Sequence, residues 1–158
     1  MWKRKVNLSN KIIILDDVMS KNECIDALNL YDPTHVWSGT YPMTVNKSDK
    51  KIMKYMNKIR KQVSKNINHN LEIEWCEIVR WPIGSSKKPH LDSQSDKTKL
   101  VSITYLNQSY TGGNTYIVDG MVCTPKIGRT LCFDGHFYVH GVTPIDWNDR
   151  YTMSIWYK

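Results

Sequence analysis

The stretch that decides the fold is HGVTPIDWNDRYTMSIWY, residues 140–157. Its second part, residues 150–157, is rich in the β-branched and aromatic residues that favour a strand, and strand side chains alternate between two faces. One face carries a cation, two hydroxyls and an indole: Arg150, Thr152, Ser154 and Trp156. This is a poor solvent face, so we expect it to line an anion pocket. The other face is predicted to pack against helices: Tyr151, Met153, Ile155 and Tyr157.

Two helices are predicted upstream of this strand. Ser20 and Glu23 form an N-terminal capping box and begin a helix that runs to about residue 30. A second helix, over residues 48–67, has apolar residues at helical spacing with lysines between them. The segment between the helices, residues 33–47, is rich in Gly and Pro and is predicted to be a loop.

The other predicted elements are short strands separated by Gly, Pro and Asp turns. They lie at residues 12–15, 72–81, 100–106, 114–118, 121–124, 130–133, 139–142 and 150–157. Helices followed by many short strands predict an α+β fold, a β-sandwich or open barrel with the helices packed on one sheet. The length of 158 residues suits one domain, with residues 1–70 supporting a β-core at 71–158 that carries the chemistry.

The composition narrows the class of protein. A hydrophobic content of 41% excludes a disordered chain, and no apolar run approaches the roughly 20 residues of a membrane helix. The apolar run at residues 12–15 is also too short for a signal peptide. We therefore expect a soluble, cytoplasmic protein of a microbe, or of the host cytoplasm if the source is viral, with no membrane partner. Its four cysteines form no C-x-x-C pair and are predicted to be reduced and buried.

The positive charge lies in one half of the chain. Residues 1–70 hold 13 Lys and Arg against 6 Asp and Glu, whereas residues 71–158 hold 9 of each. A basic face can attract nucleic acid. We favour a solvated helix surface, because no run of basic and aromatic residues forms a stacking groove. Nucleic acid is therefore a partner that the sequence permits and does not favour.

His90-Leu91-Asp92 is the first motif that carries chemistry. Side chains at i and i+2 of an extended segment point the same way, so the imidazole and the carboxylate can bind one ion. His140, 50 residues after His90, is the candidate third ligand, and two His with one carboxylate form the facial triad of non-haem iron(II) oxygenases. Arg150 is predicted to face the same cavity and to bind a carboxylate. His136 is a rival ligand, but it follows a turn signal, Asp134-Gly135.

The succession of motifs resembles the prolyl 4-hydroxylase type of iron(II)- and 2-oxoglutarate-dependent oxygenases. Each motif is weak alone, and their order and spacing are specific. The matching stretches are His90-Leu91-Asp92, Thr98–Asn107, Gly112-Gly113-Asn114-Thr115, Pro125–Gly128, His140–Pro144 and Arg150–Trp156. The resemblance covers residues 75–158 well and the N-terminal part loosely.

The resemblance implies a fold, a reaction and a set of roles. The fold would be a double-stranded β-helix, a distorted, cupin-like jelly roll. His90, Asp92 and His140 would bind iron(II). Arg150, helped by Ser154 or Thr152, would bind the distal carboxylate of 2-oxoglutarate, and Tyr105 would donate its hydroxyl to it. Oxidation of 2-oxoglutarate by O₂ to succinate and CO₂ would drive hydroxylation of the substrate, with ascorbate as an optional reductant.

Substrate contacts are predicted at three aromatic residues. Trp156 would line the pocket near the substrate, although simple packing is an equal alternative. Trp37 and Tyr41 lie in the Gly/Pro-rich segment 33–47, which could close over a substrate or anchor in the core. Tyr105 could also be an ordinary core tyrosine.

The chain departs from the family pattern at one position and matches one branch at another. Trp81 stands where some relatives carry Tyr, which changes how the pocket closes. Arg150 stands where many collagen-type relatives carry Lys, so the chain resembles the oxygen-sensor and bacterial branches more.

Three functions follow as hypotheses. The favoured one is hydroxylation of a prolyl residue in a peptide or protein. The second is the same mechanism on a free amino acid, another small molecule or a nucleic-acid base, because substrate choice depends on loops. The third, a non-enzymatic cupin-like binding module, gives no reason for Arg150 and Tyr105 to accompany the triad.

Overall fold

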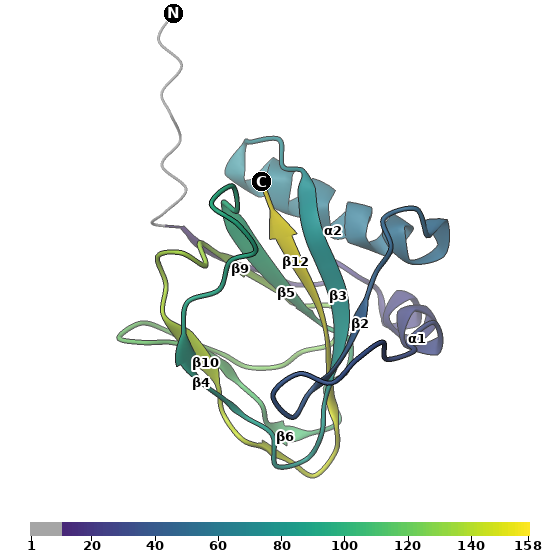
Figure 1. Ribbon diagram of the computed structural model, residues 1–158, viewed down its shortest axis with the longest axis vertical. Helices are drawn as coiled ribbons and strands as arrows, with labels where there is room; N and C mark the ends of the chain where they lie inside the picture. The colour runs from purple at the N-terminus through teal and green to yellow at the C-terminus, as the bar shows by residue number, and fades with distance from the viewer. Residues whose placement is uncertain (1–10) are drawn as a thin grey trace, which may run out of the picture.

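The structure, a computed structural model, describes residues 11–158. Residues 1–10, which the charge count above includes, lie outside the described part. Within residues 11–158, two helices and twelve strands follow one another (Figure 1). The elements are β1 (Ile12–Leu15), α1 (Lys21–Asn29), β2 (Tyr41–Thr44), α2 (Lys50–Ile67), β3 (Ile73–Trp81), β4 (Lys87–His90), β5 (Leu100–Tyr105), β6 (Thr111–Gly112), β7 (Thr115–Ile117), β8 (Val122–Cys123), β9 (Thr130–Phe133), β10 (His140–Val142), β11 (Ile145–Asp146) and β12 (Arg150–Tyr157).

The strands form a larger and a smaller antiparallel sheet, with a short third pair. The six-stranded sheet has the order β1-β9-β5-β12-β3-β2, and the four-stranded sheet has the order β4-β10-β7-β8. Figure 1 shows α1 and α2 on one side of the larger sheet and the strands β4 and β10 on its other side. The fold is therefore α+β, a double-stranded β-helix with the helices packed on one sheet, as the sequence predicted.

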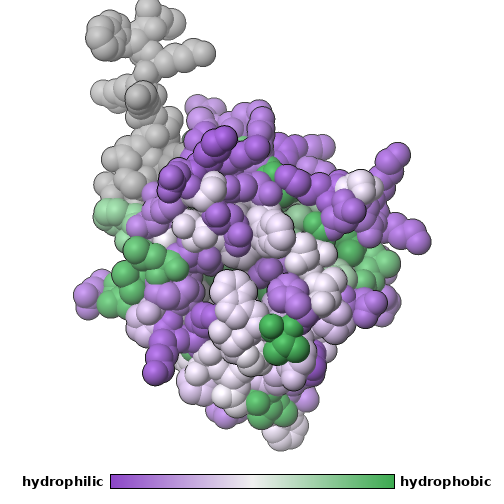
Figure 2. Space-filling view, viewed as in Figure 1, coloured by the Kyte–Doolittle hydropathy of each residue, from purple (hydrophilic) through white to green (hydrophobic). Residues whose placement is uncertain are grey.

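Both helices begin at the caps that their sequences provide. Ser20 accepts a hydrogen bond from the Glu23 backbone N–H, and the Glu23 carboxylate accepts one from the Ser20 backbone, which is the predicted capping box. Asp49 caps α2 by accepting from the Lys51 backbone N–H. The lysines of α2 remain on its outer side, and Figure 2 shows hydrophilic residues gathered at the upper end of the molecule, where α2 lies in Figure 1.

The main core lies between the helices and the outer face of the larger sheet. Met153, Ile155 and Tyr157 of β12 are fully buried there, as the alternation predicted. They pack in one cluster with the apolar stripe of α2, which includes Met56, Ile59 and Val63. Because apolar burial is the main driving force of folding, this cluster fixes the outer face of β12 and commits its other face to the interior of the β-helix.

Four short strands were not predicted. Residues 41–44 were expected to be loop, yet they form β2, which pairs with β3 along one edge. An edge strand tolerates Pro42, because its missing N–H need not face a partner. The others are β4, β6 and β11, and Asp146 of β11 lies where a turn was expected. Their hydrogen bonds come from distant partner strands, which local sequence does not reveal.

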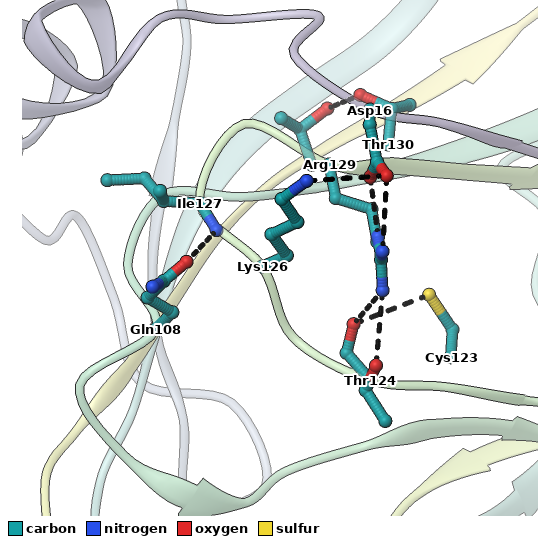
Figure 3. Close-up of polar contacts among 9 residues, drawn as sticks. Asp16, Gln108, Cys123, Thr124, Lys126, Ile127, Arg129 and Thr130 are labelled. Atoms are coloured by element: carbon teal, nitrogen blue, oxygen red, sulfur yellow. Dashed lines mark hydrogen bonds and ion pairs between the residues drawn. The ribbon is translucent and has the colours of Figure 1, made fainter.

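Gly128, the glycine of the Pro125–Gly128 motif, allows two distant segments to meet. Its backbone φ is +79°, and an added Cβ would overlap the Met19 carbonyl oxygen. The Val18 N–H donates to the Gly128 carbonyl at 3.0 Å. The neighbouring Arg129 binds both oxygens of Asp16, at 2.7 and 3.3 Å (Figure 3). These contacts attach the segment between β1 and α1 to the turn before β9.

All four cysteines are buried and form no disulfide, as predicted: Cys24, Cys76, Cys123 and Cys132. Among residues 11–158, no helix is long and apolar enough to cross a membrane.

Candidate active site

The smaller sheet brings the three predicted metal ligands together. His90 ends β4 and lies directly opposite His140, the first residue of the neighbouring strand β10. Asp92 follows His90 by two residues. One ligand atom from each residue lies within 4.8 Å of the others, and this is the single such cluster in the described chain. His136 is not part of it, because its Nε2 lies 3.1 Å from the Ser95 carbonyl oxygen.

Backbone carbonyl groups orient both imidazoles. His90 Nδ1 lies 2.7 Å from the Lys88 carbonyl oxygen, and His140 Nδ1 lies 3.0 Å from that of Tyr138. A carbonyl oxygen can only accept a hydrogen bond, so each Nδ1 carries a proton, and in the neutral tautomer with this proton the lone pair is on Nε2. Neutral imidazoles held in this tautomer are the form that binds a metal.

The electrostatics of His140 favour the same form. Burial lowers the pKa of His140, because the charged imidazolium loses its hydration, and nearby His90 lowers it further. The Tyr138 carbonyl and Asp92 act in the opposite direction. The Phe133 ring packs edge-on against the His140 ring, with 4.6 Å between ring centroids. His140 is therefore buried, and its lowered pKa favours the neutral imidazole.

The carboxylate of Asp92 is held from the larger sheet. Trp156 Nε1 donates to Asp92 Oδ1 at 3.1 Å, and the Asp92 backbone N–H donates to the Gly135 carbonyl at 2.8 Å. Trp156 is 5% exposed, so its indole is locked by packing. The structure thus gives Trp156 a specific contact, the orientation of Asp92, that sequence reasoning did not identify.

Arg150 lies at the other end of β12 with much of its charge unpartnered. It is 1% exposed, and Nη2 donates to Thr115 Oγ1 at 3.1 Å, while Nε and Nη1 have no hydrogen-bond partner. The hydroxyl of Tyr110 is buried and also without a partner. The Trp81 ring lies over the guanidinium, 4.7 Å from Arg150 Cζ. Unsatisfied buried donors are costly, so these three groups fit a carboxylate ligand.

The hydroxyl groups near Arg150 are partly engaged. The Tyr105 hydroxyl and Thr115 Oγ1 lie 2.8 Å apart, so Tyr105 and Arg150 share one threonine. Burial raises the pKa of Tyr105, which keeps its hydroxyl protonated. Thr152 Oγ1 accepts from Trp81 Nε1 at 3.3 Å, and Ser154 is half-buried on the same face.

Sequence reasoning missed Tyr110 and Thr115. Both residues flank the Gly112-Gly113-Asn114 stretch, so the motif marked the right segment without indicating which side chains reach Arg150. A Cβ added at Gly113 would come within 3.0 Å of side-chain atoms of Arg150, Ile145 and Tyr110. The glycine therefore allows this segment to approach the arginine closely.

The inner face of the larger sheet connects the two ends of the site in rows, because residues paired in register share a face. At the metal end, Trp156 pairs with Trp75 and Val101. In the next row, Ser154 pairs with Glu77 and Ile103. In the third, Thr152 pairs with Val79 and Tyr105, and in the last, Arg150 pairs with Trp81. This face thus runs from Trp156, which contacts Asp92 of the triad, to Arg150 at the other end.

Glu77 is the acidic side chain on this face of β3. It is 9% exposed, and burial raises its pKa to about 7, helped by the negative charge of Asp92 and opposed by a hydrogen bond from Trp75. Sequence reasoning did not single it out, because both faces of residues 73–81 mix apolar and charged side chains, so the alternation does not show which face is the interior one.

The structure separates the two aromatic residues of segment 33–47. Trp37 is 59% exposed, and Lys87 Nζ of β4 lies 5.3 Å from its ring, so it reaches the strand that ends at His90. Tyr41 pairs with Arg80, and the Arg80 guanidinium lies 4.4 Å from its ring. Arg80 is on the outer face of the sheet, so the structure does not bring Tyr41 to the triad.

Solved structures that share this fold over nearly the whole chain include three prolyl hydroxylases. A viral collagen prolyl hydroxylase from Paramecium bursaria Chlorella virus-1, solved with 2-oxoglutarate, aligns with a TM-score of 0.78 at 16% identity, covering 96% of this chain and 97% of that one. A prolyl 4-hydroxylase from Pseudomonas putida aligns with a TM-score of 0.70 at 19% identity, covering 93% and 91%.

The third is a prolyl hydroxylase from Trichoplax adhaerens in complex with a peptide fragment of the hypoxia-inducible factor oxygen degradation domain. It aligns with a TM-score of 0.71 at 19% identity, covering 94% of this chain and 84% of that one. Neither a protein-family model nor a curated protein sequence matches this chain. The fold is therefore that of the 2-oxoglutarate- and iron(II)-dependent oxygenases.

Proposed function

We propose that the chain is an iron(II)- and 2-oxoglutarate-dependent dioxygenase that hydroxylates a prolyl residue in a peptide or protein. One observation carries the dioxygenase: β12 contacts the His-Asp-His cluster through Trp156 at one end and holds the buried, partly unpartnered Arg150 at the other. A binding module of the same fold would have no use for both. The prolyl substrate is supported by the fold, which the chain shares with prolyl hydroxylases, one of them solved with a peptide.

The triad fits an iron(II) ion by its donor set. Two neutral imidazoles and one carboxylate from His90, Asp92 and His140 would occupy one face of the metal and leave other positions for the co-substrate and O₂. When bound, iron(II) and 2-oxoglutarate supply the oxidation, in which O₂ converts 2-oxoglutarate to succinate and CO₂ and hydroxylates a substrate carbon.

The pocket at Arg150 fits a carboxylate of 2-oxoglutarate. Arg150 Nε and Nη1 and the Tyr110 hydroxyl are the three buried polar side-chain atoms of the described chain that lack a partner. A carboxylate would satisfy the guanidinium fork and accept from the tyrosine. Thr115 orients Arg150, and the Trp81 ring covers it, which excludes water and strengthens the ion pair.

The protein's other contribution is to position the ligands. The carbonyl groups of Lys88 and Tyr138 fix the imidazoles, and Trp156 fixes Asp92. Two exposed apolar residues are sequence neighbours of the triad: Leu91 lies between His90 and Asp92, and Val139 precedes His140. We include Trp37 in the proposed substrate surface, and we propose residues 71–158 as the catalytic core.

The test is succinate formation from 2-oxoglutarate by protein purified without oxygen, loaded with iron(II) and then exposed to air, with and without ascorbate and proline-rich peptides. We expect iron-dependent succinate that rises with a peptide, together with a peptide product that has gained one oxygen atom on proline. His140→Ala should abolish both. Succinate without any peptide response would contradict the prolyl substrate and direct the search to small molecules and nucleic-acid bases.

A further inference from the structure

Glu77 is a buried carboxylate that the proposed reaction does not use. Its one hydrogen bond is a long one, from Trp75 Nε1 to Glu77 Oε2 at 3.4 Å. In residues 11–158, no Lys, Arg or His nitrogen lies within ion-pair distance of it. Burying a carboxylate without a cation or several hydrogen bonds is destabilising, so such a group is unusual unless something binds it.

The position of Glu77 is inside the proposed site. It pairs with Ser154, which lies one row from Trp156, the residue that holds Asp92, and one row from Thr152, which pairs with Tyr105. Glu77 therefore lies on the sheet face between the metal end and the arginine end. Trp75, whose indole N–H donates to Glu77, pairs with Trp156, whose indole N–H donates to Asp92.

Glu77 is not an additional metal ligand in this structure. The group of ligand atoms within 4.8 Å of one another consists of His90, Asp92 and His140, without Glu77. Nor does it pair with the guanidinium of Arg150, whose side chain contacts Thr115, Trp81 and Tyr105 instead. A buried carboxylate with one long hydrogen bond, on β3 next to the edge strand β2 and one row from Trp156, is a ready acceptor for a group that arrives with the substrate.

We propose that Glu77 determines specificity by binding a cationic group of the peptide substrate, a Lys or Arg side chain adjacent to the target proline or the protonated nitrogen of an N-terminal proline. This inference rests on the proposed function. A charge-assisted hydrogen bond to a buried carboxylate is stronger than a neutral one, so the preference should be large.

The test uses proline peptides with both termini blocked, in which the residue next to the proline is Lys, Arg, norleucine or Glu and the rest of the sequence is the same. A further peptide has an unblocked N-terminal proline. Binding is measured by fluorescence anisotropy on full-length protein with iron(II) and 2-oxoglutarate in the absence of oxygen, so that no turnover occurs. Hydroxylation is then measured in air. The variants are Glu77→Gln, which keeps the shape without the charge, and Glu72→Gln, an exposed charge control outside the site.

We expect the wild type and Glu72→Gln to bind at least one cationic peptide about 10-fold more tightly than the norleucine peptide. Glu77→Gln should bind all of them equally while binding iron(II) normally. A comparison of the Lys peptide, the Arg peptide and the peptide with a free N-terminal proline identifies which cation is recognised. If circular dichroism shows that Glu77→Gln is unfolded, Glu77→Met is used instead.

The outcomes separate the two proposals. Hydroxylation of the peptides without any preference for charge, or the same preference in Glu77→Gln, would overturn the role of Glu77 and leave the prolyl hydroxylase standing. Loss of iron(II) binding in Glu77→Gln would reassign Glu77 to the metal site. No binding or hydroxylation of any peptide would overturn the prolyl function. The role of Glu77 would then be overturned too if N-acetyl-L-lysinamide, L-prolinamide and N-acetyl-L-norleucinamide bound equally, since the first two carry a cation and the third carries none.

Discussion

Trp156 Nε1 donates a hydrogen bond to Asp92 Oδ1 across 3.1 Å, and this contact joins β12 of the larger sheet to the cluster of His90, Asp92 and His140. The tryptophan lies on the same face of β12 as Arg150. The strand that would anchor the co-substrate therefore also orients the carboxylate ligand, and the two ends of the site depend on one structural element.

Removing that hydrogen bond should weaken metal binding without unfolding the protein. In Trp156→Phe the ring still packs, but Asp92 loses its donor, and loss of such outer contacts lowers metal affinity about 10- to 100-fold. Titration with iron(II) under anaerobic conditions measures this. Trp75→Phe, an aromatic change in the same row that does not touch Asp92, is the control. Equal affinity in wild type and Trp156→Phe would show that the hydrogen bond does not orient Asp92.

Two tyrosines near Arg150 should respond differently to loss of the hydroxyl. Tyr110→Phe removes a hydroxyl that has no partner in the protein, so the unfolding free energy should stay equal or rise. Its KM for 2-oxoglutarate should rise about 5- to 10-fold, since the ligand loses a donor.

Tyr105→Phe removes the hydrogen bond to Thr115 and should destabilise the free protein by about 1 kcal/mol. Thermal unfolding and the dependence of succinate formation on 2-oxoglutarate measure both effects. The assignment of Tyr110 to the co-substrate would be refuted by an unchanged KM in Tyr110→Phe.

Glu77 should make the metal-free protein less stable as the pH rises. Its pKa in the folded protein is about 7, against 4.5 in the unfolded chain, so between these values the folded state binds more protons. The unfolding free energy then falls as pH rises through this window, and the stabilisation of the protonated form is fully present only below the unfolded pKa. The shift corresponds to at most about 3 kcal/mol.

Glu77→Gln removes this penalty. Denaturant unfolding with a chelator present should show the variant more stable than wild type at pH 8, with a difference that disappears near pH 4.5. A difference independent of pH would mean that Glu77 keeps its ordinary pKa in the folded protein.

Gly128 and Gly84 offer a test of what a positive φ alone costs. Gly128→Ala adds both backbone strain and overlap with the Met19 carbonyl, whereas Gly84, at φ +83°, has open space around it. We expect Gly84→Ala to cost about 1 kcal/mol and Gly128→Ala to cost at least about 3 kcal/mol or prevent folding. Denaturant unfolding of both variants checks this, and similar losses in the two would indicate that the segment around Met19 moves without cost.

The sequence by itself determined the features that depend on local periodicity. The alternation along residues 150–157 assigned Met153 and Ile155 to the core and Arg150 to the interior, because strand side chains alternate whatever the fold. The i, i+2 spacing of His90 and Asp92 placed both on one side of an extended segment. Their proximity to His140 is found in the structure, while their binding of iron remains a prediction.

The tertiary structure alone decided which distant residues meet. Thr115 of the smaller sheet reaches Arg150 of the larger one, and Trp156 reaches Asp92 in the segment after β4. Glu77 faces the site through the pairing of β3 with β12. The same cause hid β2, whose hydrogen bonds come from β3. Periodicity fixes the direction of a side chain relative to its own strand, but register and sheet packing fix its neighbours, and these follow only when the whole chain is folded.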